Sequence, residues 1–141
     1  MNYPIDKNSQ VLGQGAFGKV FLTHNKHNPD HKVAIKVMGL KKIKDELEAI
    51  KEEVTILTNL DHPNIVKYYE TYEDEKNIYL VMEYIGGGEL FEKIAQQKNQ
   101  VFNEVIAYEY IHKLFGALNH MHAQGIVHRD IKPENIMIGD N

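Results

Sequence analysis

An aspartate, a lysine and an asparagine stand close together in the chain, at Asp130, Lys132 and Asn135. A carboxylate can accept a proton from a hydroxyl group, and an ammonium can neutralise charge that builds on a transferring phosphoryl group. An amide oxygen suits a hard cation such as Mg²⁺. Pro133 disfavours a regular helix here. We therefore expect residues 126–136 to form a polar loop between two short buried strands; a merely solvated, charged turn is the alternative.

Three glycines, Gly13, Gly15 and Gly18, fall in the spacing G-x-G-x-x-G. Because glycine has no Cβ, backbone N–H groups can approach a phosphate closely. A dinucleotide-binding fold shares this spacing but needs a helix after the glycines and an acid about 20 residues later. Residues 19–24 are instead rich in β-forming side chains without a helical period. The sequence predicts a hairpin folded over a ligand, and the alternative is a plain hairpin without one.

Lys36 lies in a third expected strand, residues 31–38. Alternation along this strand places Ala34 and Lys36 on one face and the larger apolar side chains on the other. A lone buried ammonium is costly, so Lys36 needs an anionic partner. Residues 41–60 have the apolar period of a helix, on which Glu53 borders the apolar stripe. Glu53 is the expected partner of Lys36, and Glu52 competes with it on spacing alone.

Further β-rich runs at residues 65–73 and 77–82 would complete an antiparallel sheet of about five strands. Glycines 86–88 then form a natural hinge, and the backbone of residues 83–85 is free to bond the edge of a flat ligand. Residues 89–97 predict a short helix. A longer helix is expected to begin after Asn103, its N-cap, and to end near Gln124 and Gly125.

Composition limits the function classes. The 141 residues carry 16 basic and 20 acidic side chains, a net charge of -4, which disfavours bulk binding to nucleic acid or to a membrane surface. Cysteine is absent, so neither disulfides nor thiolate metal sites can form. His112, His120 and His122 lack a carboxylate partner at a motif spacing, which disfavours a metal site. No apolar stretch is long enough to span a bilayer, and we expect a monomer in the cytosol, with the nucleus as the alternative compartment.

Taken together and in this order, the motifs resemble those of the eukaryotic protein kinase domain. They are the glycine-rich stretch 12–20, Val-Ala-Ile-Lys at 33–36, Glu53 on the following helix, and His-Arg-Asp at 128–130 with Asn135. The resemblance implies an α+β fold in which residues 1–85 are the N-lobe, a five-stranded antiparallel sheet with one main helix. Residues 86–141 would be the hinge end and the beginning of a mainly helical C-lobe.

Two details of the resemblance concern the kind of kinase. Lys132, two places after Asp130, is similar to the serine/threonine class rather than to the tyrosine class. Residues 61–66, 87–91 and 125–128 look most like the calmodulin-dependent and calcium-dependent kinase group. The implied function is phosphoryl transfer from Mg-ATP to a serine or threonine of a protein substrate.

The resemblance also implies which residues bind the nucleotide. The hairpin backbone would cover the phosphates, and Lys36 would hold the α- and β-phosphates while Glu53 orients it. Met82 would be the gatekeeper, with hydrogen bonds to adenine from Glu83 and Ile85. Leu12, Val20, Ala34 and Met137 would sandwich the adenine ring. The full set expected at ATP is Leu12, Gly13, Gln14, Gly15, Ala16, Phe17, Gly18, Val20, Ala34, Lys36, Glu53, Met82, Glu83, Ile85, Glu89 and Met137.

For the transfer itself, the resemblance makes Asp130 the group that takes the hydroxyl proton, Lys132 a contact of the γ-phosphate and Asn135 a magnesium ligand. Glu89 and Glu134 would bind a basic residue of the peptide substrate, and Glu89 also the ribose. Arg129 would pair with an activation-loop phosphate.

The family's Asp-Phe-Gly motif does not occur in these residues. Asp140 lies too near Asn135 and is followed by asparagine, so we do not interpret it as that aspartate. We therefore expect an N-terminal part of a kinase domain that exposes the apolar stripe of its long helix, formed by Ile106, Tyr110, Leu114, Leu118 and Met121. The alternative function is a catalytically inactive fragment that binds ATP or a partner. A dehydrogenase of the dinucleotide-binding type fails because no helix follows Gly18.

Overall fold

The computed structural model describes residues 2–16 and 18–139, and it divides into two compact units. The first comprises Met1–Asp61 and Val66–Tyr84, and the second comprises His62–Ile65 and Ile85–Asn141. Phe17, expected at the nucleotide, and Asp140 lie outside the described residues.

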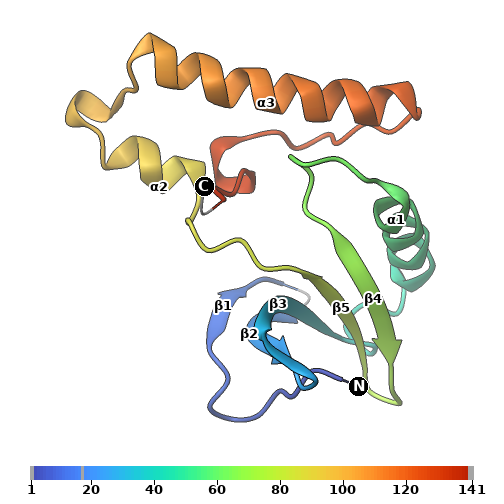
Figure 1. The fold of residues 1–141 in the computed structure, drawn as a ribbon. Helices are drawn as coiled ribbons and strands as arrows, with labels where there is room; N and C mark the ends of the chain where they lie inside the picture. The colour runs from blue at the N-terminus through green and yellow to red at the C-terminus, as the bar shows by residue number, and fades with distance from the viewer. Residues whose placement is uncertain (1, 17, 140–141) are drawn as a thin grey trace. The chain divides into compact units, whose positions relative to one another are not determined.

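The first unit is built on a five-stranded sheet in which every neighbouring pair is antiparallel, with the order β1-β2-β3-β5-β4 (Figure 1). With helix α1 it confirms the predicted α+β class. The strands are β1 Val11–Gln14, β2 Gly18–Asn25, β3 Asn28–Gly39, β4 Tyr68–Glu73 and β5 Asn77–Glu83.

One face of this sheet is covered by α1, Leu47–Asn59. The side chains of Met38, Ile43, Val54, Ile78 and Leu80 form the buried core there. The helix begins later than residue 41, the expected start. The intervening residues form turns in which the N–H groups of Lys42 and Ile43 donate to the carbonyl of Gly39, and Ile43 is fully buried. The residues expected to form the first helical turns are therefore arranged as turns that bury Ile43 in the core.

The other face of the sheet is covered by the N-terminal segment. Tyr3 is 3% exposed and packs with Val33, Ile35 and Val81. Its hydroxyl donates to Glu70 Oε1 at 2.7 Å, and Tyr72 donates to the other oxygen of the same carboxylate. The Glu70 carboxylate on β4 thus ties the N-terminal segment to the sheet.

The second unit contains α2, Leu90–Ala95, and α3, Glu104–Ala123, with a short 3₁₀ turn at Lys98–Gln100 between them. The predicted N-cap of α3 is confirmed, because Asn103 Oδ1 accepts a hydrogen bond from the N–H of Ile106 at 3.0 Å. The helix ends before Gly125, whose φ of 74° suits glycine. Within the described ranges, no helix has the length and apolar character needed to cross a membrane.

The prediction of an exposed stripe on α3 is wrong in its residues. Met121 is buried, and the other members of that stripe are half-buried within the unit. The helix has a second apolar face, which is the exposed one. Its large apolar side chains are Val105, Tyr108, Ile111 and Phe115.

After α3 the chain runs back toward the start of α2 (Figure 1). The two expected buried strands around Asp130 do not form in this described segment. Val127 is 63% exposed, and the only β-contact here is a single bridge between Met137 and Glu89. The N–H of Ile126 donates to the carbonyl of Met121 at 3.0 Å, which directs the chain off the helix as an irregular loop rather than as a strand.

Candidate active site

The glycine-rich segment forms the predicted hairpin. The N–H of Gly15 donates to the carbonyl of Gly18 at 2.9 Å, and Gln14 pairs with Lys19 across the β1–β2 ladder. A Cβ built on Gly18 would lie 1.8 Å from the carbonyl oxygen of Val37, so the close approach of β3 requires glycine there. At Gly13 and Gly15 a Cβ would meet nothing within 4 Å among the described atoms. Among these three glycines the described packing requires glycine only at Gly18, and no described atom fills the space over the other two.

Lys36 and Ala34 share one face of β3, as the alternation predicted. In the antiparallel ladders Lys36 stands opposite Val20 on β2 and Leu80 on β5. Ala34 stands opposite Met82. Since paired residues point to the same side, these side chains gather on the sheet face that α1 covers. Lys36 is half-buried.

Glu53 is exposed on α1, and the structure does not pair its carboxylate with Lys36. The ion pairs among the described residues are Lys51–Glu73 at 3.0 Å, Lys67–Asp61 at 3.7 Å and Lys132–Asp130 at 3.4 Å. Glu53 does lie near Tyr68: burial raises the pKa of the Tyr68 phenol, and the Glu53 carboxylate raises it further. The orienting role of Glu53 stays a prediction, as does the competing role of Glu52.

The residues expected to bond adenine differ in how their polar groups are used. The Glu83 N–H donates to the carbonyl of Lys67 at 2.8 Å, and the Glu83 carboxylate accepts from the N–H of Lys67 at 3.2 Å. Both groups thus hold the start of β4. Ile85 is half-buried, and neither its N–H nor its carbonyl bonds any described residue. Its backbone is therefore free to bond a ligand edge.

Asp130, Lys132 and Asn135 form one cluster in the second unit. Asn135 Nδ2 lies 2.9 Å from Asp130 Oδ2 and 2.9 Å from the Asp130 carbonyl oxygen. Lys132 Nζ is 3.4 Å from Asp130 Oδ2. Asp130 Oδ1 and Asn135 Oδ1 make no hydrogen bond with any residue that the structure describes. These two oxygens are the ones that a hydroxyl donor and a cation would use.

Local backbone geometry positions this cluster. Arg129 has a φ of 71°, a left-handed conformation that is uncommon outside glycine. The N–H of Asp130 then donates to His128 Nδ1 at 3.1 Å, and the N–H of Asn135 donates to the carbonyl of Lys132 at 2.9 Å. The second bond closes the 3₁₀ turn Pro133–Asn135. Sequence reasoning gave His128 no role; its place two residues before Asp130 is the only signal that could have indicated one.

Glu89 and Met137, far apart in sequence, are joined by an isolated β-bridge. The N–H of Leu90 donates to the carbonyl of Ile136 at 2.8 Å, and the N–H of Ile138 donates to Gly88 at 2.8 Å. A Cβ on Gly87 would lie 2.3 Å from the Ile138 carbonyl oxygen, so this contact requires glycine. The sequence indicated Gly87 as a hinge residue but not as a packing residue. Glu134 is exposed, in the 3₁₀ turn.

The three histidines of α3 have other neighbours. The His112 ring stacks on Tyr108, and the His120 ring lies 5.2 Å from His62 and hydrogen-bonds Gln124. In the described part of the chain, no group of three or more His, Cys, Asp or Glu side chains could hold a metal ion.

Comparison with known proteins identifies the family. The sequence matches the protein kinase domain over residues 7–141, so the chain belongs to the protein kinase domain family. It is 42% identical over 127 residues to a calcium/calmodulin-dependent protein kinase type 1 of Macrobrachium nipponense, covering 90% of this chain and 36% of that protein.

Two further relatives are similar to the same degree. A calcium-dependent protein kinase 5 of Plasmodium falciparum is 43% identical over 139 residues, covering 99% of this chain and 23% of that protein. An Aurora kinase of Saccharomyces cerevisiae is 42% identical over 132 residues, covering 92% of this chain and 35% of that protein. The chain thus spans only about a quarter to a third of the length of the curated relatives it matches.

Proposed function

We propose that the protein to which these residues belong is an ATP-dependent serine/threonine protein kinase that transfers the γ-phosphoryl group of Mg-ATP to a protein hydroxyl. Family membership supports the reaction class. The single observation that carries the proposal is the double hydrogen bond from Asn135 to Asp130. It holds one carboxylate oxygen and leaves Asp130 Oδ1 free to accept a bond from a substrate hydroxyl.

Asp130 would act first on the hydroxyl acceptor. Its free oxygen accepts the hydrogen bond and orients the hydroxyl oxygen for in-line attack on the γ-phosphorus. As the new P–O bond forms and the bond to the β-phosphate oxygen breaks, the hydroxyl proton passes to the carboxylate. The main contribution of the residue is positioning, since little covalent chemistry falls to the protein in this reaction.

Lys132 and Asn135 would act on charge. The Lys132 ammonium, 3.4 Å from Asp130, can stabilise negative charge on the transferring group. Asn135 Oδ1 offers an oxygen ligand for Mg²⁺, which when bound to ATP neutralises the phosphates.

The residues of the first unit would bind ATP. The open space at Gly13 and Gly15 and the half-buried ammonium of Lys36 are suited to phosphate oxygens. Val20, Ala34 and Met82 supply the apolar surface expected to contact adenine. The unbonded backbone groups of Ile85 would accept and donate at the edge of the base.

The substrate would be a protein segment with a basic residue near its serine or threonine. The exposed Glu134 carboxylate, in the turn between Lys132 and Asn135, supports this proposal, as does Glu89. The similarity to the calcium/calmodulin-dependent and calcium-dependent relatives favours a place in that group. Calcium dependence of this protein would need residues beyond these motifs.

A phosphorylation assay with Mg-ATP and a basic serine-containing peptide tests the proposal. In the intact parent protein, Asp130→Asn should lower turnover by roughly 10²-fold or more while ATP binding stays near normal. Unchanged turnover would refute the role of Asp130.

A second candidate is an ATP-binding chain without turnover. The open space at Gly13 and Gly15 and the half-buried ammonium of Lys36 favour it, because they could hold phosphates whether or not transfer follows. The same assay on this chain separates the two. Turnover would exclude the second candidate, and ATP binding without transfer would support it.

A further inference from the structure

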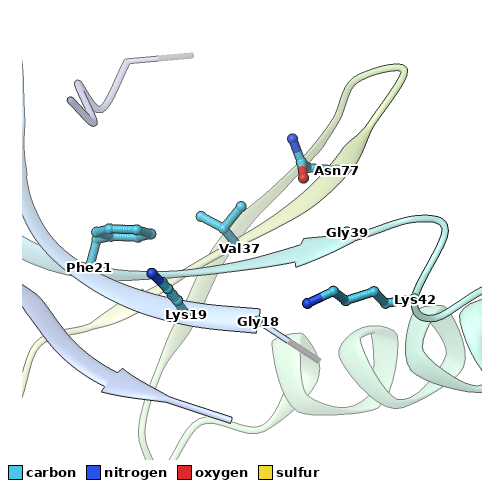
Figure 2. Close-up of a pocket in the computed structure, with 7 residues that line it drawn as sticks. All are labelled: Gly18, Lys19, Phe21, Val37, Gly39, Lys42 and Asn77. Carbon is cyan, nitrogen blue, oxygen red and sulfur yellow. The ribbon is translucent and has the colours of Figure 1, made fainter. Parts of the chain in front are cut away.

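A hollow of about 270 Å³ lies in the first unit, on the sheet face opposite to Lys36 (Figure 2). Lys19 pairs with Val37 across the β2–β3 ladder, whereas the adjacent pair is Val20 with Lys36. Because neighbouring residues on a strand point to opposite faces, the hollow cannot share the Lys36 face. Its lining residues are Gly18, Lys19, Phe21, Val37, Gly39, Lys42 and Asn77.

Two ammonium groups give the hollow positive charge. Neither Lys19 nor Lys42 forms an ion pair with a carboxylate of the described residues. Figure 2 shows Lys42 extended toward Gly18, and a tight turn holds its backbone because its N–H donates to the Gly39 carbonyl at 2.8 Å. Asp74, just before this part of β5, is already occupied: its carboxylate accepts from Tyr79 and from the N–H groups of Lys76 and Asn77. The charge of the two lysines is therefore available to an anion.

Apart from the amide of Asn77, the rest of the described lining is apolar. Phe21 and Val37 are half-buried and flank the Lys19 side chain (Figure 2). An aromatic ring beside ammonium groups suits a ligand that carries an anion on an apolar body. A volume of about 270 Å³ lies just below the range of roughly 300–1,000 Å³ typical of drug-sized ligands, so the fit is to a single ring or side chain rather than to a whole nucleotide.

We propose that this hollow binds a phosphomonoester on a ring or similarly small apolar body, such as a phosphorylated aromatic side chain of a peptide or a free aryl phosphate. The phosphate would contact the Lys19 and Lys42 ammoniums, and the apolar body would contact Phe21 and Val37. Such a ligand would also contact Gly18, the residue packed against the Val37 carbonyl at the base of the glycine-rich hairpin. The site takes a different ligand from the proposed phosphoryl transfer and does not depend on it.

A titration of this chain with phenyl phosphate, followed by backbone amide NMR shifts, tests the site. We expect saturable shifts at Gly18, Lys19, Gly39 and Asn77. Lys19→Ala and Lys42→Ala should each weaken binding about threefold to tenfold, as expected for charge-assisted contacts that are partly screened by water. Lys41→Ala, an exposed lysine next to Lys42 that does not line the hollow, is the matched control and should leave binding unchanged.

Further arms separate the possible ligands. A phosphotyrosine peptide that binds more tightly than phenyl phosphate would assign the site to a peptide, and equal affinity would assign it to a free aryl phosphate. The proposal is overturned by shifts confined to residues 13–15 and 36, by the absence of saturation, or by equal weakening in the Lys41 control. Inorganic phosphate binding as tightly as phenyl phosphate would overturn the role given to Phe21 and Val37.

Discussion

Asn135 and Asp130 are joined twice, since one amide nitrogen lies 2.9 Å from both the carbonyl oxygen and Oδ2 of the aspartate. Both acceptors are oxygens that cannot donate, so the amide must present its nitrogen to Asp130 and its oxygen away from it. One residue therefore fixes the rotation of the proposed base and also aims a cation ligand outward.

Asn135→Ala should remove both effects in the proposed kinase. We expect turnover to fall by about 10²-fold, as is typical for loss of a group that positions and neutralises charge, and the Mg²⁺ concentration needed for half-maximal rate to rise. Steady-state phosphorylation at varied Mg²⁺ measures both. Asn119→Ala, an exposed asparagine on α3, is the control, and an equal loss in that variant would contradict the assignment.

Lys36→Met should weaken the use of ATP, because the ammonium that would bind the α- and β-phosphates is lost while the apolar stem is kept. The expected result is a fall of about 10²-fold or more in kcat/KM for ATP in the proposed kinase. Lys32→Met changes an exposed lysine on the same strand and should retain near-normal values. Equal activity of the Lys36 and wild-type proteins would remove Lys36 from the phosphate site.

Glu53 and Glu52 can be distinguished in the same assay. Both are exposed here, and Glu53 is the one near Tyr68. If Glu53 orients Lys36, Glu53→Gln should lower kcat/KM for ATP by about tenfold or more, whereas Glu52→Gln should have little effect. The reverse order would transfer the role to Glu52.

Replacement by alanine should lower the free energy of unfolding at Gly18 but hardly at Gly13. The Cβ of Gly18→Ala would collide with the Val37 carbonyl oxygen, so we expect a loss of about 1–3 kcal/mol in the free energy of unfolding, a typical cost of overpacking. The Cβ of Gly13→Ala would meet no described atom within 4 Å, so this change should affect stability little while reducing nucleotide affinity. Urea unfolding and ATP titration of the two variants give the comparison. A stable Gly18→Ala protein would show that β2 and β3 separate easily.

The tie between Tyr3 and Glu70 should depend on pH. Hydrogen bonds from Tyr72 and Tyr3 hold the pKa of the Glu70 carboxyl below its ordinary value of 4.5. A carboxyl with a lowered folded-state pKa contributes stability above its unfolded-state pKa and loses that contribution as the pH falls through the folded-state value. Tyr3→Phe should therefore destabilise the protein at pH 7 and have a smaller effect near pH 3, as measured by urea unfolding.

The same tie should also weaken in alkali. Burial, with Glu70 adding to it, raises the pKa of Tyr3 to about 12 from an ordinary 10. Stability linked to the neutral phenol is fully present below pH 10 and is lost as the pH rises toward 12. Tyr108→Phe, at an exposed tyrosine, is the control for both pH ranges. If the difference in the free energy of unfolding between wild type and Tyr3→Phe did not change with pH, the stabilising role of the Tyr3–Glu70 hydrogen bond would be refuted.

The parts of the fold that sequence reasoning predicted depend on local patterns. Alternation along β3 sufficed to place Ala34 and Lys36 on one face, and Asn103 was recognisable as a helix cap. The start of α1 was wrong because the tertiary burial of Ile43 outweighed helical periodicity. The strands expected around Asp130 were wrong for a similar reason, since bonds to Met121 and to residues 88–90 hold that segment as a loop.

In the candidate site, too, some features could be predicted from local sequence and others could not. Its residue types could be predicted from motif spacing, but the contact of Glu89 with Met137 joins positions 48 apart, and no local pattern indicates such a pairing. The role of His128 as an acceptor depends on the left-handed backbone of Arg129, which the sequence does not indicate.

The outward row of large apolar side chains on α3 has a practical consequence for anyone handling this chain. Val105, Tyr108 and Phe115 are each more than 60% exposed, so the helix presents a row of apolar side chains to water. Purified preparations should bind hydrophobic dyes and scatter more light as they are concentrated. Replacing Val105 and Phe115 by glutamate or lysine should make them easier to keep dispersed without disturbing the loop around Asp130.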